Sequence, residues 1–165
     1  MNQPDPLVDA QSQPAQALTA TRQRAHALIA KSRSSSVQAC FARMMDLPRS
    51  TPLRPTEIGL IMVRGRVGGD GQRFNLGELP VARAAVRIEN GPVGVGYVAG
   101  RDHDHAEMAA LADAMVQSDA WREQLEDMVL APLAAELAER KDANARKAAA
   151  TKVDFFTMVR TRAEK

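Results

Sequence analysis

The sequence of 165 residues has a single cysteine, Cys40, and few aromatic side chains, which make up 4% of the chain. One cysteine cannot form an intrachain disulfide, and alone it cannot hold an iron–sulfur cluster or a structural zinc. We expect Cys40 to be a small hydrophobe on a helix, half-buried. The scarcity of aromatic rings leaves little surface for stacking on bases, which weakens an interpretation as a single-stranded nucleic-acid binder.

Long apolar runs are also missing from the chain. No stretch reaches the roughly 18 apolar residues that a membrane-spanning helix needs. The start of the chain has neither the basic n-region nor the apolar h-region of a signal peptide. We therefore expect a cytoplasmic protein that contacts no membrane. Hydrophobic residues still make up 45% of the chain, which is enough for one folded domain at this length.

The net charge is small, at +2, but the charges fall into blocks. Residues 54–101 carry seven arginines against four acids, and residues 104–139 carry nine acids against one arginine. Residues 140–165 carry eight basic side chains against three acids. Such blocks are typical of a protein with several neighbours, and less typical of a uniformly basic nucleic-acid binder.

The pattern of apolar and turn-forming residues predicts an α+β fold. Residues 1–18, rich in Pro, Gln and Ala, are predicted to be a disordered lead, and Thr19 or Thr21 is expected to cap the first helix. Residues 19–152 are predicted to form a single domain, in which helices precede and follow a central antiparallel sheet of about three to four strands. Residues 153–165 are predicted to be an extended interaction tail.

Turn-forming residues divide the predicted strands. A long strand over 57–67 is expected to end at residues 68–71, where the pair Asp70-Gly71 would supply the positive φ angles of a tight hairpin. Further strands are expected at 74–78, 81–89 and 93–99, with Pro80 limiting the pairing of the first. The predicted helices around this sheet bury four apolar stripes, which include Val37, Cys40, Phe41, Met44 and Met45 in the second helix and Met108, Leu111, Ala112, Met115 and Val116 in a later one. Pro132 is expected in the first turn of the last helix, which runs to about residue 150.

Arginines on the predicted sheet are the first candidates for a binding site. Because side chains alternate along a strand, Arg64 and Arg66 share one face, and Arg83 and Arg87 share a face of another strand. If the two strands are neighbours, the four guanidiniums form one cationic patch suited to phosphate or carboxylate. The competing interpretation is a solvated sheet face, or pairing of the arginines with nearby acids: Glu57, Glu78 and Glu89.

The segment after Gly100 is a second candidate, because it places Arg101 beside the positive end of a helix dipole. His103 and His105 are two residues apart, a spacing that puts them on different faces of a helix and disfavours a metal site. A helix cap from Asp102 or Asp104, with His105 packed or hydrogen-bonded, is favoured instead. No nucleophile, base and orienting group can be assembled from the spacing alone, so no catalytic residue is assigned.

The C-terminal segment 153–165 follows a basic helix and carries an apolar cluster. This cluster packs on its own domain or is buried against a partner, and the second is slightly favoured because an apolar strand can extend a foreign sheet edge. Its candidate interface residues are Phe155, Phe156, Met158 and Val159.

Seven runs of residues together resemble the PhnG family of the bacterial carbon–phosphorus lyase core complex. They follow that family's order and spacing over about residues 20–161, and the last is the most specific. The runs are EIGLIMVRGRVGGDG at 57–71, FNLGE at 74–78, RAAVR at 83–87, GRD at 100–102, HAE at 105–107, APL at 131–133 and VDFFTMVR at 153–160.

The resemblance implies a non-catalytic but required subunit, with partners of the PhnH, PhnI and PhnJ types. In the complex an alkylphosphonate displaces adenine from Mg-ATP to give an α-D-ribose 1-phosphonate 5-triphosphate. The family assigns the nucleosidase centre to the PhnI type and the iron–sulfur cluster with S-adenosylmethionine to the PhnJ type, so no cofactor and no nucleic acid are expected on this chain alone. A stand-alone module that binds anions or nucleic acid is the alternative.

Overall fold

The computed structural model describes residues 6–152 of the chain, with side chains from residue 15 onward. It has the predicted α+β class, with helices before and after one antiparallel sheet. The elements are α1 Pro6–Lys31, α2 Ser34–Ala42, β1 Ser50–Pro52, β2 Glu57–Arg66, a 3-10 turn Val67–Gly69, β3 Arg73–Ile88, β4 Val93–Ala99, α3 His103–Val116, α4 Asp119–Leu125, a π-helical turn Glu126–Leu130 and α5 Ala131–Ala150.

The strand β3 is the centre of the sheet, and every other strand pairs with it in antiparallel fashion. Residues 81–83 of β3 pair with β2 and also with β4, and residues 86–87 pair with β1 and also with β4. Since each strand has two edges, β1 and β2 lie end to end along one edge of β3 and β4 lies along the other. The part of β3 before residue 81 therefore has β2 as its strand neighbour and lacks β4 on its other edge.

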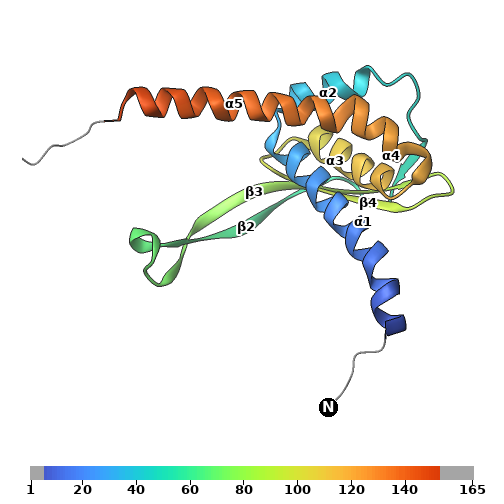
Figure 1. Ribbon diagram of the computed structural model, residues 1–165, viewed down its shortest axis with the longest axis horizontal. Helices are drawn as coiled ribbons and strands as arrows, with labels where there is room; N and C mark the ends of the chain where they lie inside the picture. Colours follow the sequence, from blue (N-terminus) through green and yellow to red (C-terminus); the bar gives the residue numbers. More distant parts are fainter. Residues whose placement is uncertain (1–5, 153–165) are drawn as a thin grey trace, which may run out of the picture.

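This uncovered half of β3 and most of β2 form a two-stranded ribbon that extends away from the helices (Figure 1). We call residues 60–80 the arm. None of its residues is buried. A bulge between Val63 and Arg64 shifts the register by one residue, so that Val63 lies opposite Gly77 and Arg64 lies opposite Asn75.

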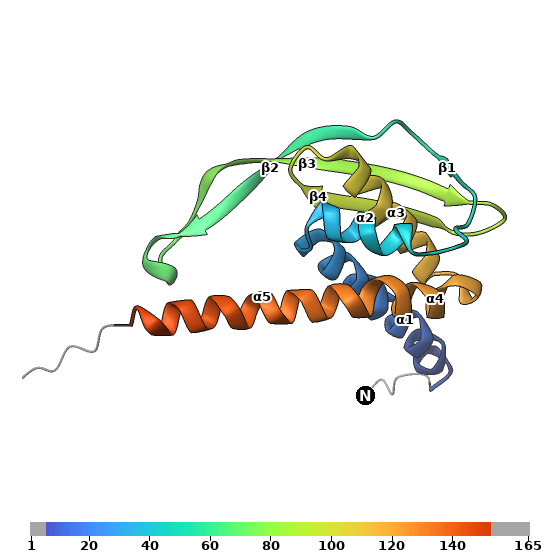
Figure 2. The same cartoon turned by 90° about the horizontal axis from the view of Figure 1, so that it is seen from above.

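The helices lie on one face of the other half of the sheet, with α3 directly against β3 and β4 (Figure 2). Gly94 and Gly96 permit this close contact, because a Cβ at either position would collide with the backbone carbonyls of Ala110 and Ala106. The helices α1, α2 and α4 pack in turn onto α3. The core between them is built of aliphatic side chains and alanines, among them Ile29, Val37, Val98, Met115, Leu125, Leu130 and Leu133.

The first turn of the last helix, α5, buries Leu133 in this core, and the rest of the helix extends away from the body of the molecule. Both views show it extending on the same side as the arm, well separated from it (Figures 1 and 2). Pro132 lies in its first turn, as predicted. The backbone stays helical from α4 into α5, but at the junction the Ala131 N–H bonds to the Glu126 carbonyl, one residue further back than in an α-helix.

Three predicted details of the helices need correction. The first helix begins at Pro6, so the predicted lead is helical from that residue on, and Thr19 and Thr21 do not cap it. Their hydroxyls instead donate to the carbonyls of Ala15 and Ala17 inside the helix, 2.8 and 2.9 Å away. In the second stripe Met45 is 97% exposed, because α2 ends at Ala42 and the chain turns before Met45 can reach the core.

Two predicted details of the strands are also wrong. The positive φ angles of the hairpin turn are at Gly68 and Gly69, while Asp70 has a φ of −119°. Pro80 does not interrupt pairing, since β3 runs through it. Its carbonyl accepts from the Gly100 N–H on the β4 side. The nitrogen and carbonyl of one strand residue point to the same edge, so the missing N–H of proline leaves the β2 pairing intact.

Candidate functional site

The strand register separates the four arginines of the predicted cationic patch into two distant pairs. The strands are neighbours, as the prediction required, but Arg66 lies opposite Arg73, whereas Arg83 lies opposite Glu57. These positions are ten residues apart along β3, or about 30 Å at the rise of a β-strand. Arg64 and Arg66 are therefore at the far end of the arm, and Arg83 and Arg87 are on the body of the sheet.

At the tip of the arm, Arg64 and Arg66 are joined by Arg73, and all three side chains are exposed. They surround a hollow of about 380 Å³, which is also lined by Gly65. Arg66 donates to the carbonyl of Gly71 across the turn, with 3.0 Å between nitrogen and oxygen. In the described part of the chain none of the three makes an ion pair, so their charge faces outward. Such a cluster suits a carboxylate or a phosphate.

Arg73 was not among the candidates predicted from the sequence. The hairpin places it opposite Arg66, and a correct count of the turn from Val67 to Gln72 gives that pairing. The prediction instead placed the next strand at residue 74. The missing signal was the length of the turn, which begins with a 3-10 segment held by the Gly71 N–H and the Val67 carbonyl at 2.9 Å.

The other predicted arginines have different surroundings. Arg83 pairs with Glu57 at 3.1 Å, and Glu57 also pairs with Arg54 at 3.3 Å. For Arg83 the competing prediction, pairing with a nearby acid, is therefore correct. Arg87 is exposed and lines a shallow hollow beside β1 and the turn after β3. Arg101 is exposed before the first turn of α3. None of the three belongs to the cluster at the tip.

The arm has an apolar face as well as its basic tip. Alternation and register put Ile61, Val63 and Leu79 on one face. A Cβ at Gly65 would lie 3.7 Å from the ring of Phe74 and 4.0 Å from Leu76, which places both side chains beside Gly65, on that same face. Phe74 is 42% exposed and Leu76 is 66% exposed. The apolar face is therefore open to solvent along the arm.

The start of α3 is a helix cap, as predicted. The Asp102 carboxylate accepts from the His105 N–H at 2.9 Å. The buried His105 ring lies 3.0 Å from the Ile29 carbonyl, which links α3 to α1. His103 is exposed. Among residues 6–152 no cluster of three or more side chains is arranged to hold a metal ion.

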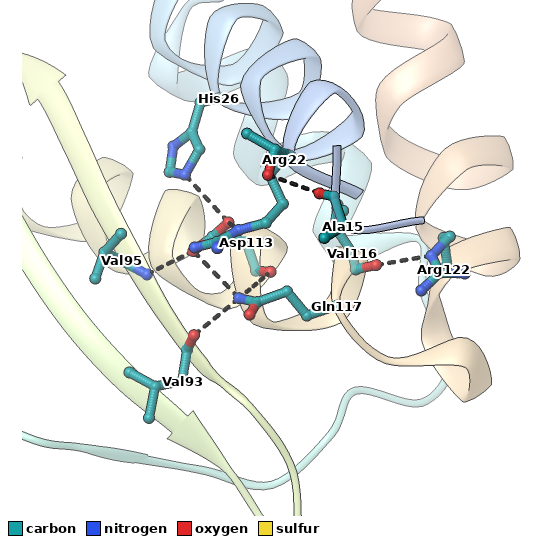
Figure 3. A network of polar contacts seen from close by, with 10 residues as sticks. Ala15, Arg22, His26, Val93, Val95, Asp113, Val116, Gln117 and Arg122 are labelled. Carbon is teal, nitrogen blue, oxygen red and sulfur yellow. Dashed lines mark hydrogen bonds and ion pairs between the residues drawn. The ribbon is translucent and has the colours of Figure 1, made fainter. Parts of the chain in front are cut away.

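A buried carboxylate, Asp113, is the centre of a polar network between α1, β4 and α3 (Figure 3). It accepts from the Arg22 Nε at 2.8 Å and from the Val95 N–H at 2.9 Å, and its Oδ1 lies 3.2 Å from the His26 ring. Burial would raise the pKa of Asp113, but the hydrogen bonds from His26 and Arg22, with that of Val95, lower this pKa well below its usual range. The network ties α1 and the open edge of β4 to α3.

Sequence reasoning did not single out Asp113. The available signal was an acidic residue within an apolar helical run, between Ala112 and Ala114. Its partners Arg22 and Val95 come from other elements, so spacing within the helix could not identify them. Gln117 adds a neighbouring contact by donating to the Val93 carbonyl at 2.8 Å. The bonds from Gln117 and to Asp113 satisfy two backbone groups of β4 on its edge away from β3.

The predicted interface residues Phe155, Phe156, Met158 and Val159 lie outside the residues that the structure describes. Within 6–152, no helix combines the length and apolar character needed to cross a membrane.

The structure thus combines an α+β body with an exposed apolar arm that ends in an arginine-rich tip. The chain belongs to the PhnG family, since the family model for phosphonate metabolism protein PhnG matches residues 20–161. A protein of Rhizobium meliloti (strain 1021), the alpha-D-ribose 1-methylphosphonate 5-triphosphate synthase subunit PhnG, is 42% identical over 157 residues, which cover 93% of this chain and 98% of that relative. The resemblance read from the sequence is thus confirmed, and the chain is a protein of phosphonate metabolism.

Proposed function

We propose that this chain is a non-catalytic but required subunit of the carbon–phosphorus lyase core complex. In this role it supports the step in which a phosphonate displaces adenine from ATP, giving α-D-ribose 1-phosphonate 5-triphosphate. The observation that carries the proposal is the 42% identity to a relative named as a synthase subunit, over 98% of that relative's length. The exposed arm supports it, because a surface of this kind fits a component of an assembly better than a stand-alone enzyme.

The proposal assigns the chemistry to partner subunits. PhnH-, PhnI- and PhnJ-type chains would join this one, with Mg-ATP and an alkylphosphonate as substrates. The iron–sulfur cluster and S-adenosylmethionine would belong to the PhnJ-type partner. Catalysis elsewhere in the assembly also fits the positions of Arg64, Arg66 and Arg73. These arginines lie on an open tip and not in an enclosed, water-excluding site.

Adenine release measured with purified subunits tests this function. PhnH- and PhnI-type partners are incubated with Mg-ATP and methylphosphonate, with and without this chain, and adenine is quantified by chromatography. We expect release with all three chains and none from this chain alone. Full activity of the partners without it would contradict a required role, and turnover by the isolated chain would contradict a non-catalytic one.

A second candidate is a stand-alone module that binds anions or nucleic acid. The cluster of Arg64, Arg66 and Arg73 favours it, because three unpaired guanidiniums attract phosphates. The acidic block at 104–139 counts against a duplex partner, since it repels the phosphate backbone. Fluorescence anisotropy with a labelled DNA duplex at increasing salt separates the candidates. Tight binding that weakens steeply with salt would support the module, and we expect no such binding.

A further inference from the structure

The arm exposes large apolar side chains on both of its faces. On the apolar face Phe74 and Leu76 are 42% and 66% exposed, and on the opposite face Leu60 and Met62 are 61% and 51% exposed. An isolated two-stranded ribbon is marginally stable in water, and large exposed apolar patches mark contact surfaces. The arm therefore has the character of one half of an interface.

The charge of the arm restricts what can cover it. Its tip carries Arg64, Arg66 and Arg73 against the single acid Asp70. The exposed half of α5, which extends on the same side of the body, adds Lys141, Arg146 and Lys147 against Asp142. A binding partner that is complementary to the arm must place carboxylates opposite the tip arginines and an apolar surface along the ribbon.

We propose that the arm docks in an apolar groove of a different protein subunit of the same assembly, with its tip arginines paired to carboxylates of that subunit. This inference rests on the proposed function, since it presumes such an assembly. Among the described residues, the edge of β3 before Pro80 that faces away from β2 has no strand neighbour, and its backbone donors and acceptors can pair with a strand of the partner.

A second copy of this chain is a poorer occupant. It offers a hollow of about 410 Å³ beside β1 that contains Asp104 and Glu107. The Glu107 carboxylate, however, already accepts the Thr56 hydroxyl at 2.6 Å. Pairing with an arriving arginine would compete with this bond, so a different subunit fits better.

Co-purification of tagged variants with co-expressed PhnH-, PhnI- and PhnJ-type subunits tests the docking. The apolar variant combines Phe74→Ser with Leu76→Ser, and the charge variant combines Arg64→Glu with Arg66→Glu. The matched controls are Val95→Ser with Tyr97→Ser, which are 47% and 49% exposed on the body of the sheet, and the single change Arg87→Glu.

We expect both arm variants to recover at least about tenfold less partner than the unmodified chain, because hot-spot contacts of this kind dominate interfaces. Both controls should recover as much partner as the unmodified chain. Thermal unfolding of each isolated variant should match the wild type, since all the changed side chains are exposed. A decrease in recovery with an unchanged melting curve supports docking by the arm.

Three results would overturn the inference. If the arm variants recover partners as well as the unmodified chain does, the arm is not the interface although the assembly exists. If the charge variant assembles normally but releases no adenine, the tip arginines contact substrate instead of carboxylates. If size-exclusion chromatography shows a dimer that the arm variants convert to a monomer, the occupant is a second copy. Failure of the unmodified chain to recover any partner would instead refute the proposed function itself.

Discussion

Asp113 is a buried carboxylate whose shortest contacts come from other elements, while Gln117 at the end of α3 adds a longer bond of 3.4 Å. Arg22 donates to the Asp113 carboxylate from two nitrogens, each 2.8 Å from a carboxylate oxygen, and the Val95 N–H donates a third hydrogen bond. The Asp113 side chain is 2% exposed, whereas that of Arg22 is 35% exposed. An ion pair with one buried member is sensitive to loss of either charge, because the remaining group keeps its desolvation cost. This residue should therefore contribute more to stability than any surface pair.

Replacing Asp113 with Asn should lower the free energy of unfolding by about 3 kcal/mol, since Arg22 and His26 lose their anionic partner. Chemical denaturation of the isolated chain measures the change. Glu126→Gln is the matched control, because it breaks a two-bond pair with Arg24 in which both side chains are more than a third exposed. The control should cost less than about 1 kcal/mol. Equal effects of the two substitutions would contradict the importance of burial.

The lowered pKa of Asp113 also predicts a pH dependence of stability. A carboxyl whose folded pKa is below its unfolded value stabilises the protein above the unfolded pKa, near 4, and loses that contribution as the pH falls through the folded pKa. The urea concentration at the midpoint of unfolding, measured between pH 6 and pH 3, should therefore decrease in the wild type once the pH is below about 4. In Asp113→Asn the fall should be shallower. Parallel curves for both proteins would show that other acids cause the loss.

At the scale of elements, the close packing of α3 against β4 depends on two glycines, Gly94 and Gly96. Any Cβ at Gly96 would meet the carbonyl of Ala106, which is fixed backbone and cannot move as a flexible side chain does. The helix would have to lift from the sheet, and the buried contacts of Ala106 and Ala110 would open. Small residues on both partners thus set the distance between the helix and the sheet.

Gly96→Ala should therefore destabilise the chain by about 3 kcal/mol or more, through overpacking against backbone. Gly77→Ala in the arm is the control, because a Cβ there meets nothing within 4 Å and the residue does not have a positive φ. Thermal unfolding followed by circular dichroism compares the two. A control that melts as early as Gly96→Ala would contradict the collision as the cause, since Gly→Ala at a compatible backbone conformation otherwise stabilises a protein through the unfolded chain.

Much of the fold could be predicted from local signals in the sequence. Alternating strands and the Asp102 cap both follow from contacts within a few residues, and both are present. The candidate site was harder, because it depends on the register. A turn one residue longer shifts the pairing of the following strand, and the length of the turn after Val67 could not be counted from the residues alone.

The same limit explains the arginines and the buried network. Arg66 in β2 lies opposite Arg73, which is ten residues along β3 from Arg83, because the ribbon is long and Pro80 does not end it. Asp113 and Arg22 are 91 residues apart in the chain, and their pairing depends on how α1 crosses α3. Spacing within one element carries no information on either distance.

At the scale of the whole molecule, β3 belongs to two environments. Residues 82–88 lie between β4 and the β1–β2 edge, and Ala82, Ala84 and Val86 are buried under the helices. Residues 73–79 have β2 as a neighbouring strand, and all of them are exposed. One continuous strand therefore joins a protected core to an open projection. Local stability should fall from the body toward the tip, because opening of the arm breaks few buried contacts.

Hydrogen exchange measured by mass spectrometry should resolve this gradient. In the free chain, amides of residues 74–79 should exchange at least about a hundredfold faster than those of residues 82–88, since the arm opens without unfolding of the body. When the partner subunits are added, the arm should become protected while peptides from β4 stay unchanged. Protection over β4 without any change in the arm would place the interface on the outer sheet face. Uniform exchange along β3 in the free chain would show that the arm and the body unfold as one unit.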